Sequence, residues 1–134
     1  MATPPNPQDD YGKMMKGKTG LQRIINATTY SRDGLRAACE EQGFRQLLWL
    51  HGVLLVLSFV LPFSLTVQMG LILVSGLSLA VELLNTGIEA AVDHTSLERH
   101  PLAKRAKDVG SAAQSVMLAL TTLLWVVALV RSFI

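Results

Sequence analysis

Residues 46–81 read "QLLWLHGVLLVLSFVLPFSLTVQMGLILVSGLSLAV" and contain no Lys, Arg, Asp or Glu. A bilayer interior strongly disfavours charged side chains, so an uncharged run of this length predicts membrane-spanning helices. The run exceeds a single span of about 20 residues, and Pro62 within it predicts a turn between two helices. A second uncharged run, 109–130, predicts a third span. We therefore expect an all-α integral membrane protein with spans at about 46–62, 66–92 and 110–131.

The composition also indicates an integral membrane protein, because half of the 134 residues are hydrophobic and only 16% are charged. Such a chain is too apolar for an ordinary soluble domain. Its single cysteine, Cys39, excludes an intrachain disulfide framework and a thiolate metal cluster. We expect one membrane domain over residues 19–134, preceded by a flexible basic tail over residues 1–18, and we expect no nucleic-acid partner.

Basic residues are concentrated before the first span and between the second and third spans, whereas the turn at Pro62 carries no charge. By the positive-inside rule, this distribution predicts a cytoplasmic N-terminus and a C-terminus on the outer side of the membrane. Residues of about 19–45 alternate apolar and charged positions at near-helical spacing, which predicts an amphipathic helix on the cytoplasmic surface. The segment Ser31–Gly34 marks a candidate break in that helix.

The N-terminal stretch "GKMMKGKT", residues 12–19, matches the P-loop pattern letter for letter. A P-loop needs a buried strand before it, because the strand delivers the glycine-rich turn onto a helix N-terminus. The preceding "PPNPQDDY" cannot form a buried strand. We therefore interpret residues 12–19 as part of a basic tail near anionic lipid headgroups.

Four polar residues share one face of the second span, in the pattern E-x-x-N-x-x-x-E-x-x-x-D: Glu82, Asn85, Glu89 and Asp93. If the helix enters the membrane at Thr66, its rise places Glu82 about 24 Å along and Glu89 about 35 Å along. Glu82 then lies just inside the cytoplasmic boundary of a hydrocarbon core about 30 Å thick. An acid at that depth indicates a functional site, although a hydrogen-bonded seam between helices is the structural alternative.

Carboxylates on one helical face suit Mg²⁺, which proteins commonly hold through one or two carboxylates together with substrate phosphates. The adjoining loop adds Lys104, Arg105 and Lys107, which could neutralise such phosphates. Acids for a metal, bases for a phosphate and a deeper Glu82 together indicate phosphoryl transfer to a lipid hydroxyl.

The same residues carry a family resemblance. "VELLNTGIEAAVD" at 81–93 and "AKRAKDVGSAA" at 103–113, with "GLRAA" and "FRQ" upstream, closely resemble the prokaryotic diacylglycerol kinases. The likeness runs from about Leu21 to the C-terminus. It implies a homotrimer in the bacterial inner membrane, with three spans and a surface helix in each chain. The implied reaction transfers the γ-phosphate of ATP to diacylglycerol with Mg²⁺, at the cytoplasmic face.

By motif position, the resemblance makes Glu82 the catalytic base and Glu89 a metal ligand. Asn85 and Asp93 would support the site from the same helical face. Residues implied to bind nucleotide are Arg23, Tyr30, Glu98, His100, Lys107 and Asp108. Ser111 aligns with a substrate contact, and Arg36 of the "GLRAA" motif is a further candidate for substrate binding.

Three departures from the family pattern affect the expected site. The segment before "FRQ" is one residue shorter here, so either Glu41 or Glu40 could supply a metal-binding acid, and we favour Glu41. Leu47 stands where many members have another Glu, and Arg99 stands where an aromatic is usual.

Two other hypotheses remain alongside diacylglycerol kinase. An undecaprenol kinase shares the acidic helix, and "RAKDVGSAA" favours the diacylglycerol branch. A small transporter or assembly subunit is the alternative from a different class. A transporter would be expected to place its ionisable residue near the bilayer midplane, between paired repeats. Here the acids lie at one end beside a basic loop, and no repeat is visible.

Overall fold

The computed structural model describes residues 20–95 and 100–134, and every element in these ranges is an α-helix. The helices are α2 (Leu21–Glu40), α3 (Gln42–Val60), α4 (Leu65–Thr95) and α5 (Pro101–Phe133). Two compact units divide after Arg36, and each is described by itself. The predicted tail, the P-loop-like stretch and Glu98 lie outside the described residues.

The first unit holds most of α2, whose large apolar and charged side chains are exposed. The candidate break at Ser31–Gly34 is wrong, because α2 is continuous from Leu21 to Glu40. Instead of redirecting the chain, the Ser31 hydroxyl donates to the Ala27 carbonyl one turn earlier, at 2.8 Å, as helical serines do. The helix ends later, at Glu40, and Glu41 has extended backbone angles and caps α3.

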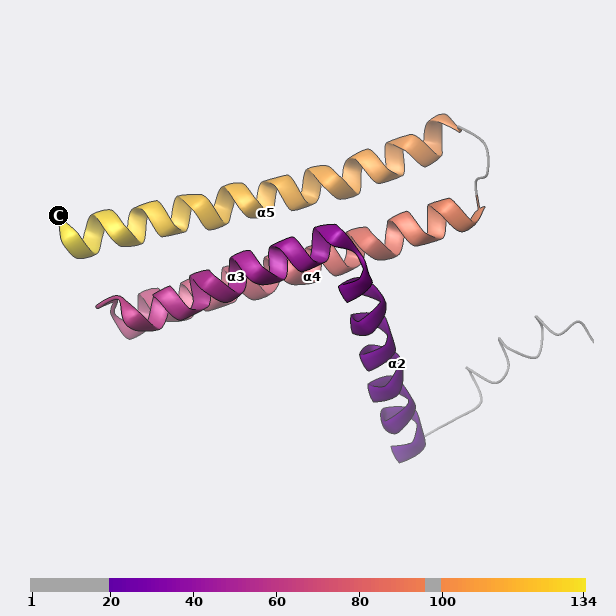
Figure 1. The fold of residues 1–134 in the computed structure, drawn as a ribbon, viewed down its shortest axis with the longest axis horizontal. Helices are drawn as coiled ribbons and strands as arrows, with labels where there is room; N and C mark the ends of the chain where they lie inside the picture. Colours follow the sequence, from indigo (N-terminus) through magenta and orange to yellow (C-terminus); the bar gives the residue numbers. More distant parts are fainter. Residues whose placement is uncertain (1–19, 96–99) are drawn as a thin grey trace, which may run out of the picture. The chain divides into compact units, whose positions relative to one another are not determined.

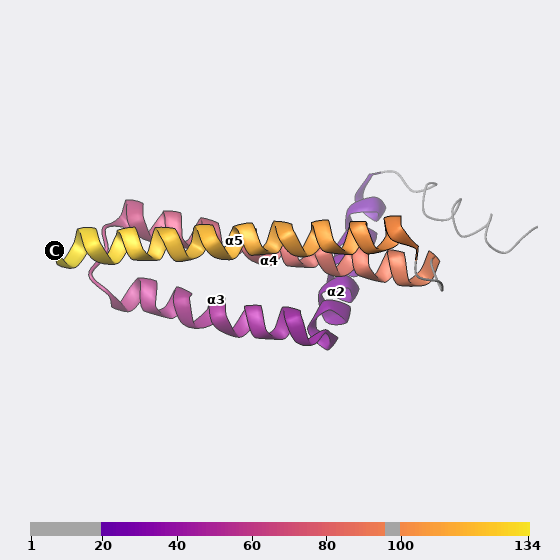
Figure 2. The same cartoon turned by 90° about the horizontal axis from the view of Figure 1, so that it is seen from above.

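In the second unit, α3, α4 and α5 run alongside one another, with α3 and α5 both packed on α4 (Figures 1 and 2). All three are long and apolar enough to cross a membrane, which confirms the expected number of spans. Large apolar side chains such as Leu73, Leu84 and Val60 are exposed on these helices. That exposure is what lipid-facing surfaces require, since acyl chains are as apolar as the side chains.

The turn between α3 and α4 forms where Pro62 predicted it. Leu61 has the extended backbone that a residue before proline adopts, with φ −78° and ψ 148°, and it ends α3. A small apolar cluster packs beside this turn, containing Phe63, Leu71, Trp125 and Ala128. The rings of Phe63 and Trp125 meet edge to face, with centroids 5.8 Å apart.

At the opposite end, α5 begins at Pro101, a residue suited to the first helical position because no intrahelical bond needs its missing N–H. His100 caps this helix, since its Nδ1 accepts from the Leu102 backbone N–H at 3.2 Å. The proline and the cap together start α5 well before the uncharged run. The helix therefore carries Lys104, Lys107 and Asp108 alongside the end of α4.

We predict that Trp125 stabilises the turn end of the second unit through packing rather than hydrogen bonding, because its Nε1 is buried and unpartnered. Trp125→Ala should lower the midpoint of thermal unfolding in detergent micelles by at least about 5 °C. Trp125→Phe retains the edge-to-face contact and removes the unsatisfied donor, so its midpoint should stay within about 2 °C of the wild type. Trp49→Ala is the control, because Trp49 is 77% exposed. An equal loss in Trp49→Ala and Trp125→Ala would contradict the packing role.

Candidate functional site

The expected acidic face is present on α4, and its members differ in burial. Glu82 and Asn85 are buried, Glu89 is partly buried and Asp93 is exposed. Burial therefore falls steadily toward the end of α4. The four polar residues share one face, as the 3.6-residue period predicted, and along that face they run from the interior of the three-helix unit to its surface.

Glu82 is the deepest acid, with 9% of its surface exposed. Within the described part of the chain, no hydrogen bond or ion pair holds its carboxylate. Gly43, in the first turn of α3, lies beside it: a Cβ added at Gly43 would be 3.2 Å from Glu82 Oε1. The lack of a side chain at Gly43 thus lets α3 approach the acid closely. A buried carboxylate without a partner is costly, and such a group is a candidate proton acceptor.

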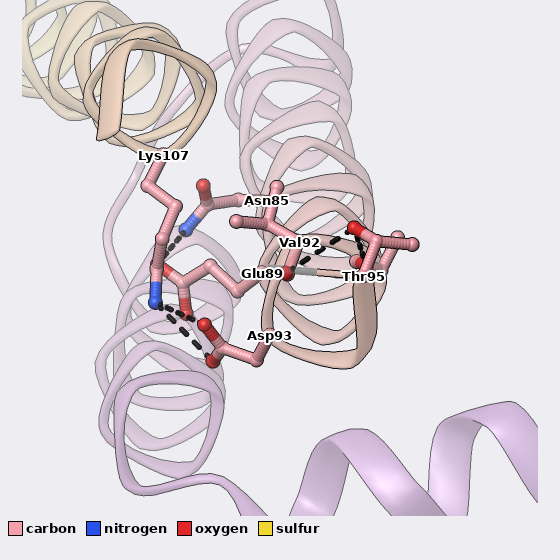
Figure 3. A network of polar contacts seen from close by, with 7 residues as sticks. Asn85, Glu89, Val92, Asp93, Thr95 and Lys107 are labelled. Carbon is pink, nitrogen blue, oxygen red and sulfur yellow. Dashed lines mark hydrogen bonds and ion pairs between the residues drawn. The ribbon is translucent and has the colours of Figure 1, made fainter. Parts of the chain in front are cut away.

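Asn85 and Glu89 follow Glu82 along the same polar face of α4. Asn85 Nδ2 donates to Glu89 Oε1 at 3.5 Å, a long contact that Figure 3 shows in place. The other amide atom of the same side chain, Asn85 Oδ1, is buried and has no protein partner. Asn85 therefore turns its nitrogen toward Glu89, while its oxygen packs against Gly110 of α5. Of these two side chains, the partly buried Glu89 carboxylate is the one whose hard oxygen atoms suit Mg²⁺.

No group of three or more His, Cys, Asp or Glu side chains gathers as a metal site within residues 20–95 and 100–134. Glu41, the favoured third acid, is exposed and caps α3 through its backbone, without a side-chain cap bond. Glu40 is also exposed, and its carbonyl accepts from Arg45 Nη1 at 2.7 Å. The choice between Glu40 and Glu41 stays a prediction.

Ion pairs occupy the loop-side end of the site. Lys107 Nζ on α5 donates to both carboxylate oxygens of Asp93 on α4, at 2.9 and 3.2 Å (Figure 3). One turn away along α5, Lys104 pairs with Asp108. The structure thus brings Lys107 to the acidic face from a different helix. Two cations that sequence analysis assigned to phosphate are paired with carboxylates.

The remaining predicted residues lie in three places. Ser111 is exposed on α5, next to Gly110, and His100 is exposed at the cap of the same helix. The residues on α2 are exposed members of the first unit: Arg23, Tyr30 and Arg36. Leu47, at the position of the missing acid, is partly buried on α3.

Gly110 is a site residue that sequence reasoning missed. A Cβ at this position would lie 2.2 Å from Asn85 Oδ1, so only glycine allows α5 to pack this closely over Asn85. Gly110 belongs to the "KDVGSAA" segment that carries the family resemblance. The sequence does not show which residue of another helix packs against this glycine, and its importance depends on that residue. An apolar groove of about 730 Å³ between α4 and α5 opens beside the same contact, with Arg105 among its lining residues.

We predict that Gly110→Ala displaces Asn85 and destabilises the fold, because even small overpacking of a buried contact costs about 1 to 3 kcal/mol. The midpoint of thermal unfolding in micelles should fall by about 5 °C or more. Gly52→Ala is the matched control, since nothing lies within 4 Å of a Cβ at Gly52. If Gly110→Ala melts like the wild type, the close α4–α5 approach at Asn85 is incorrect.

Comparison with known proteins covers nearly all of the described chain. Residues 29–129 match the family described as prokaryotic diacylglycerol kinase. A Pseudomonas aeruginosa protein named diacylglycerol kinase is 54% identical over 111 residues, which cover 82% of this chain and 90% of the relative. The Helicobacter pylori (strain 26695) protein of the same name is 47% identical over 107 residues, covering 79% of this chain and 84% of the relative. The protein of that name from Escherichia coli K12 is 40% identical over 125 residues, covering 90% and 99%.

Proposed function

The chain belongs to the prokaryotic diacylglycerol kinase family, and we propose on this premise that it transfers the γ-phosphate of ATP to the hydroxyl of diacylglycerol, forming phosphatidic acid. The observation that carries the proposal is the arrangement around α4. An unpartnered, buried Glu82 lies at the inner end of the polar face, and Lys107 reaches the outer end from α5. This order suits a lipid hydroxyl arriving from the membrane and a phosphate arriving from water.

In the proposed reaction, Glu82 accepts the proton of the lipid hydroxyl while that oxygen attacks the γ-phosphorus. The bond from the γ-phosphorus to the bridging oxygen breaks, and ADP leaves with the electron pair. Phosphoryl transfer depends mainly on alignment and charge stabilisation, so the protein has little covalent chemistry to perform. Glu82 is free to accept that proton because no described residue bonds or pairs with its carboxylate.

Glu89 would hold Mg²⁺, with Glu41 as the favoured additional ligand and Asn85 supporting Glu89 through its amide nitrogen. The ion would neutralise charge on the β- and γ-phosphates. Lys107 would leave Asp93 to contact a phosphate, and Asp108 would assist at the same helix end. We further assign nucleotide contacts to Arg23, Tyr30, Glu98 and His100. Ser111 and Arg36 are assigned to the lipid substrate.

We place this single kinase domain, residues 19–134, in the bacterial inner membrane as a homotrimer. The excess of basic residues before α3 and between α4 and α5 supports a cytoplasmic N-terminus and a periplasmic C-terminus. The same orientation would put Lys107 and Asp93 at the cytoplasmic face, where ATP is present. Three helices offer few walls for a site that binds both ATP and a lipid, which favours assembly of several chains.

The first test is Mg²⁺-dependent phosphorylation of dioleoylglycerol and of undecaprenol by purified protein in mixed micelles. We expect turnover of dioleoylglycerol, lost by at least about 100-fold in Glu82→Gln because the proton acceptor is removed. A Gly17→Ala/Lys18→Ala double variant should retain activity, since the P-loop-like stretch takes no part. If only undecaprenol is phosphorylated, the lipid substrate is undecaprenol rather than diacylglycerol. No turnover of either lipid would overturn the kinase proposal.

A second prediction concerns the proposed trimer. Glu82 and Glu89 lie on one face of one helix, so we expect both to serve the same site from the same chain. Mixing Glu82→Gln chains with Glu89→Gln chains, followed by reconstitution, should restore little activity. Wild-type chains diluted with either variant provide the control for subunit exchange. Substantial recovery in the mixed variants would show that the two acids reach one site from different chains.

A further inference from the structure

One hydroxyl joins all three long helices inside the second unit. Ser78 on α4 lies 2.9 Å from His51 Nε2 of α3 through its Oγ, and the same Oγ accepts from Gln114 Nε2 of α5 at 3.0 Å. His51 and Ser78 have no exposed surface, and Gln114 is 7% exposed. Each long helix therefore contributes one side chain to a buried polar contact. We refer to these three residues as the Ser78 triad.

The triad has no substitute partners within the described residues. His51 Nδ1 and Gln114 Oε1 are buried and make no hydrogen bond, so each side chain is held only through Ser78. A serine hydroxyl supplies one proton and two lone pairs, enough for two simultaneous partners. If α4 rotated, His51, Ser78 and Gln114 would all lose these contacts while still buried. Buried polar groups left unpaired are costly, so the triad resists that rotation.

Ser78 precedes Glu82 by one helical turn on the same face of α4. Each of these two residues faces a residue of α3. His51 contacts Ser78, and Gly43 lies close to Glu82. Glu82 makes no hydrogen bond or ion pair of its own with the described residues. Its carboxylate is therefore aimed by the rotation of α4 and by packing, and the nearest polar contact that fixes that rotation is the triad.

We propose that His51, Ser78 and Gln114 are positioning residues that set the direction of the Glu82 carboxylate by fixing the rotation of α4 between α3 and α5. This inference rests on the proposed function, in which Glu82 accepts the proton of the lipid hydroxyl. The triad then affects the rate of the chemical step rather than the binding of substrate. None of the three residues touches substrate, because the triad is enclosed within the unit.

The test compares Ser78→Ala with Ser58→Ala in the micelle assay, with both proteins shown to be folded at the assay temperature. Ser58 is an equally buried serine of α3, but its hydroxyl donates only to the Leu55 carbonyl of its own helix, at 2.7 Å. A misplacement of about 1 Å can lower a reaction rate on the order of 100-fold. We expect Ser78→Ala to lower kcat by about tenfold or more, with KM for MgATP and dioleoylglycerol within about twofold. Ser58→Ala should keep the wild-type kcat.

A second pair of variants separates positioning from folding and covers the case in which Ser78→Ala does not fold. His51→Gln keeps an amide near the position of Nε2, whereas His51→Leu removes every group that could hydrogen-bond to the Ser78 hydroxyl. We expect His51→Gln to retain most of the wild-type kcat and His51→Leu to lose it, while both keep wild-type KM values. Recovery with the polar replacement is a result that general loss of packing would not produce.

The outcomes distinguish this inference from the proposed function. If the wild type phosphorylates dioleoylglycerol but Ser78→Ala and His51→Leu keep its kcat, only the positioning role is overturned. The same holds if Ser58→Ala loses as much kcat as Ser78→Ala, or if the triad variants raise KM alone. A wild type without turnover overturns the proposed function, and the positioning role falls with it.

Discussion

The absence of water inside a bilayer is the constraint on which this structure depends. Backbone groups are satisfied there by the α-helices themselves, and polar side chains must find partners within the chain. The buried polar residues of α3, α4 and α5 accordingly include hydroxyls that bond their own helix, as Ser58 and Thr121 do. The partly buried Gln68 bonds a neighbouring helix instead, donating to the Ser58 carbonyl at 3.1 Å. Glu82 is the buried carboxylate left out of these arrangements.

The three membrane spans were predictable because the lack of water in the bilayer interior directly limits which amino acids a span can contain. Charge-free runs follow from the cost of burying charge, and Pro62 ends α3 through the restricted backbone of Leu61. The expected break in α2 was wrong for a related reason. Ser31 and Gly34 weaken a helix only slightly, and neither forces the backbone out of helical geometry. The observed interruption of the helix at Glu41 has no comparable marker, since glutamate carries no strong preference for a cap position.

Much of the candidate site was also predictable, because Asn85, Glu89 and Asp93 lie on one helix and a period of 3.6 residues fixes their relative directions. The partners from other helices were harder to foresee. Lys107 meets Asp93 only because α5 packs against α4 in one particular register. Gly110 matters only because Asn85 faces it. A scan for charged residues also passed over His51 and Gln114, which are polar but formally uncharged at neutral pH.

The ion pairs at the outer end bear on how a nucleotide could enter. Exposed pairs such as Lys107–Asp93 and Lys104–Asp108 contribute little to stability, because water screens them. A triphosphate carries several negative charges and strong acceptor oxygens, so it can replace a carboxylate as the partner of Lys107 at little cost. Until then, the pair with Asp93 keeps Lys107 at the acidic end of α4. The role proposed for Glu82 requires the opposite arrangement. A proton acceptor must stay free of such partners, so the direction of its carboxylate has to come from the packing of the helices around it.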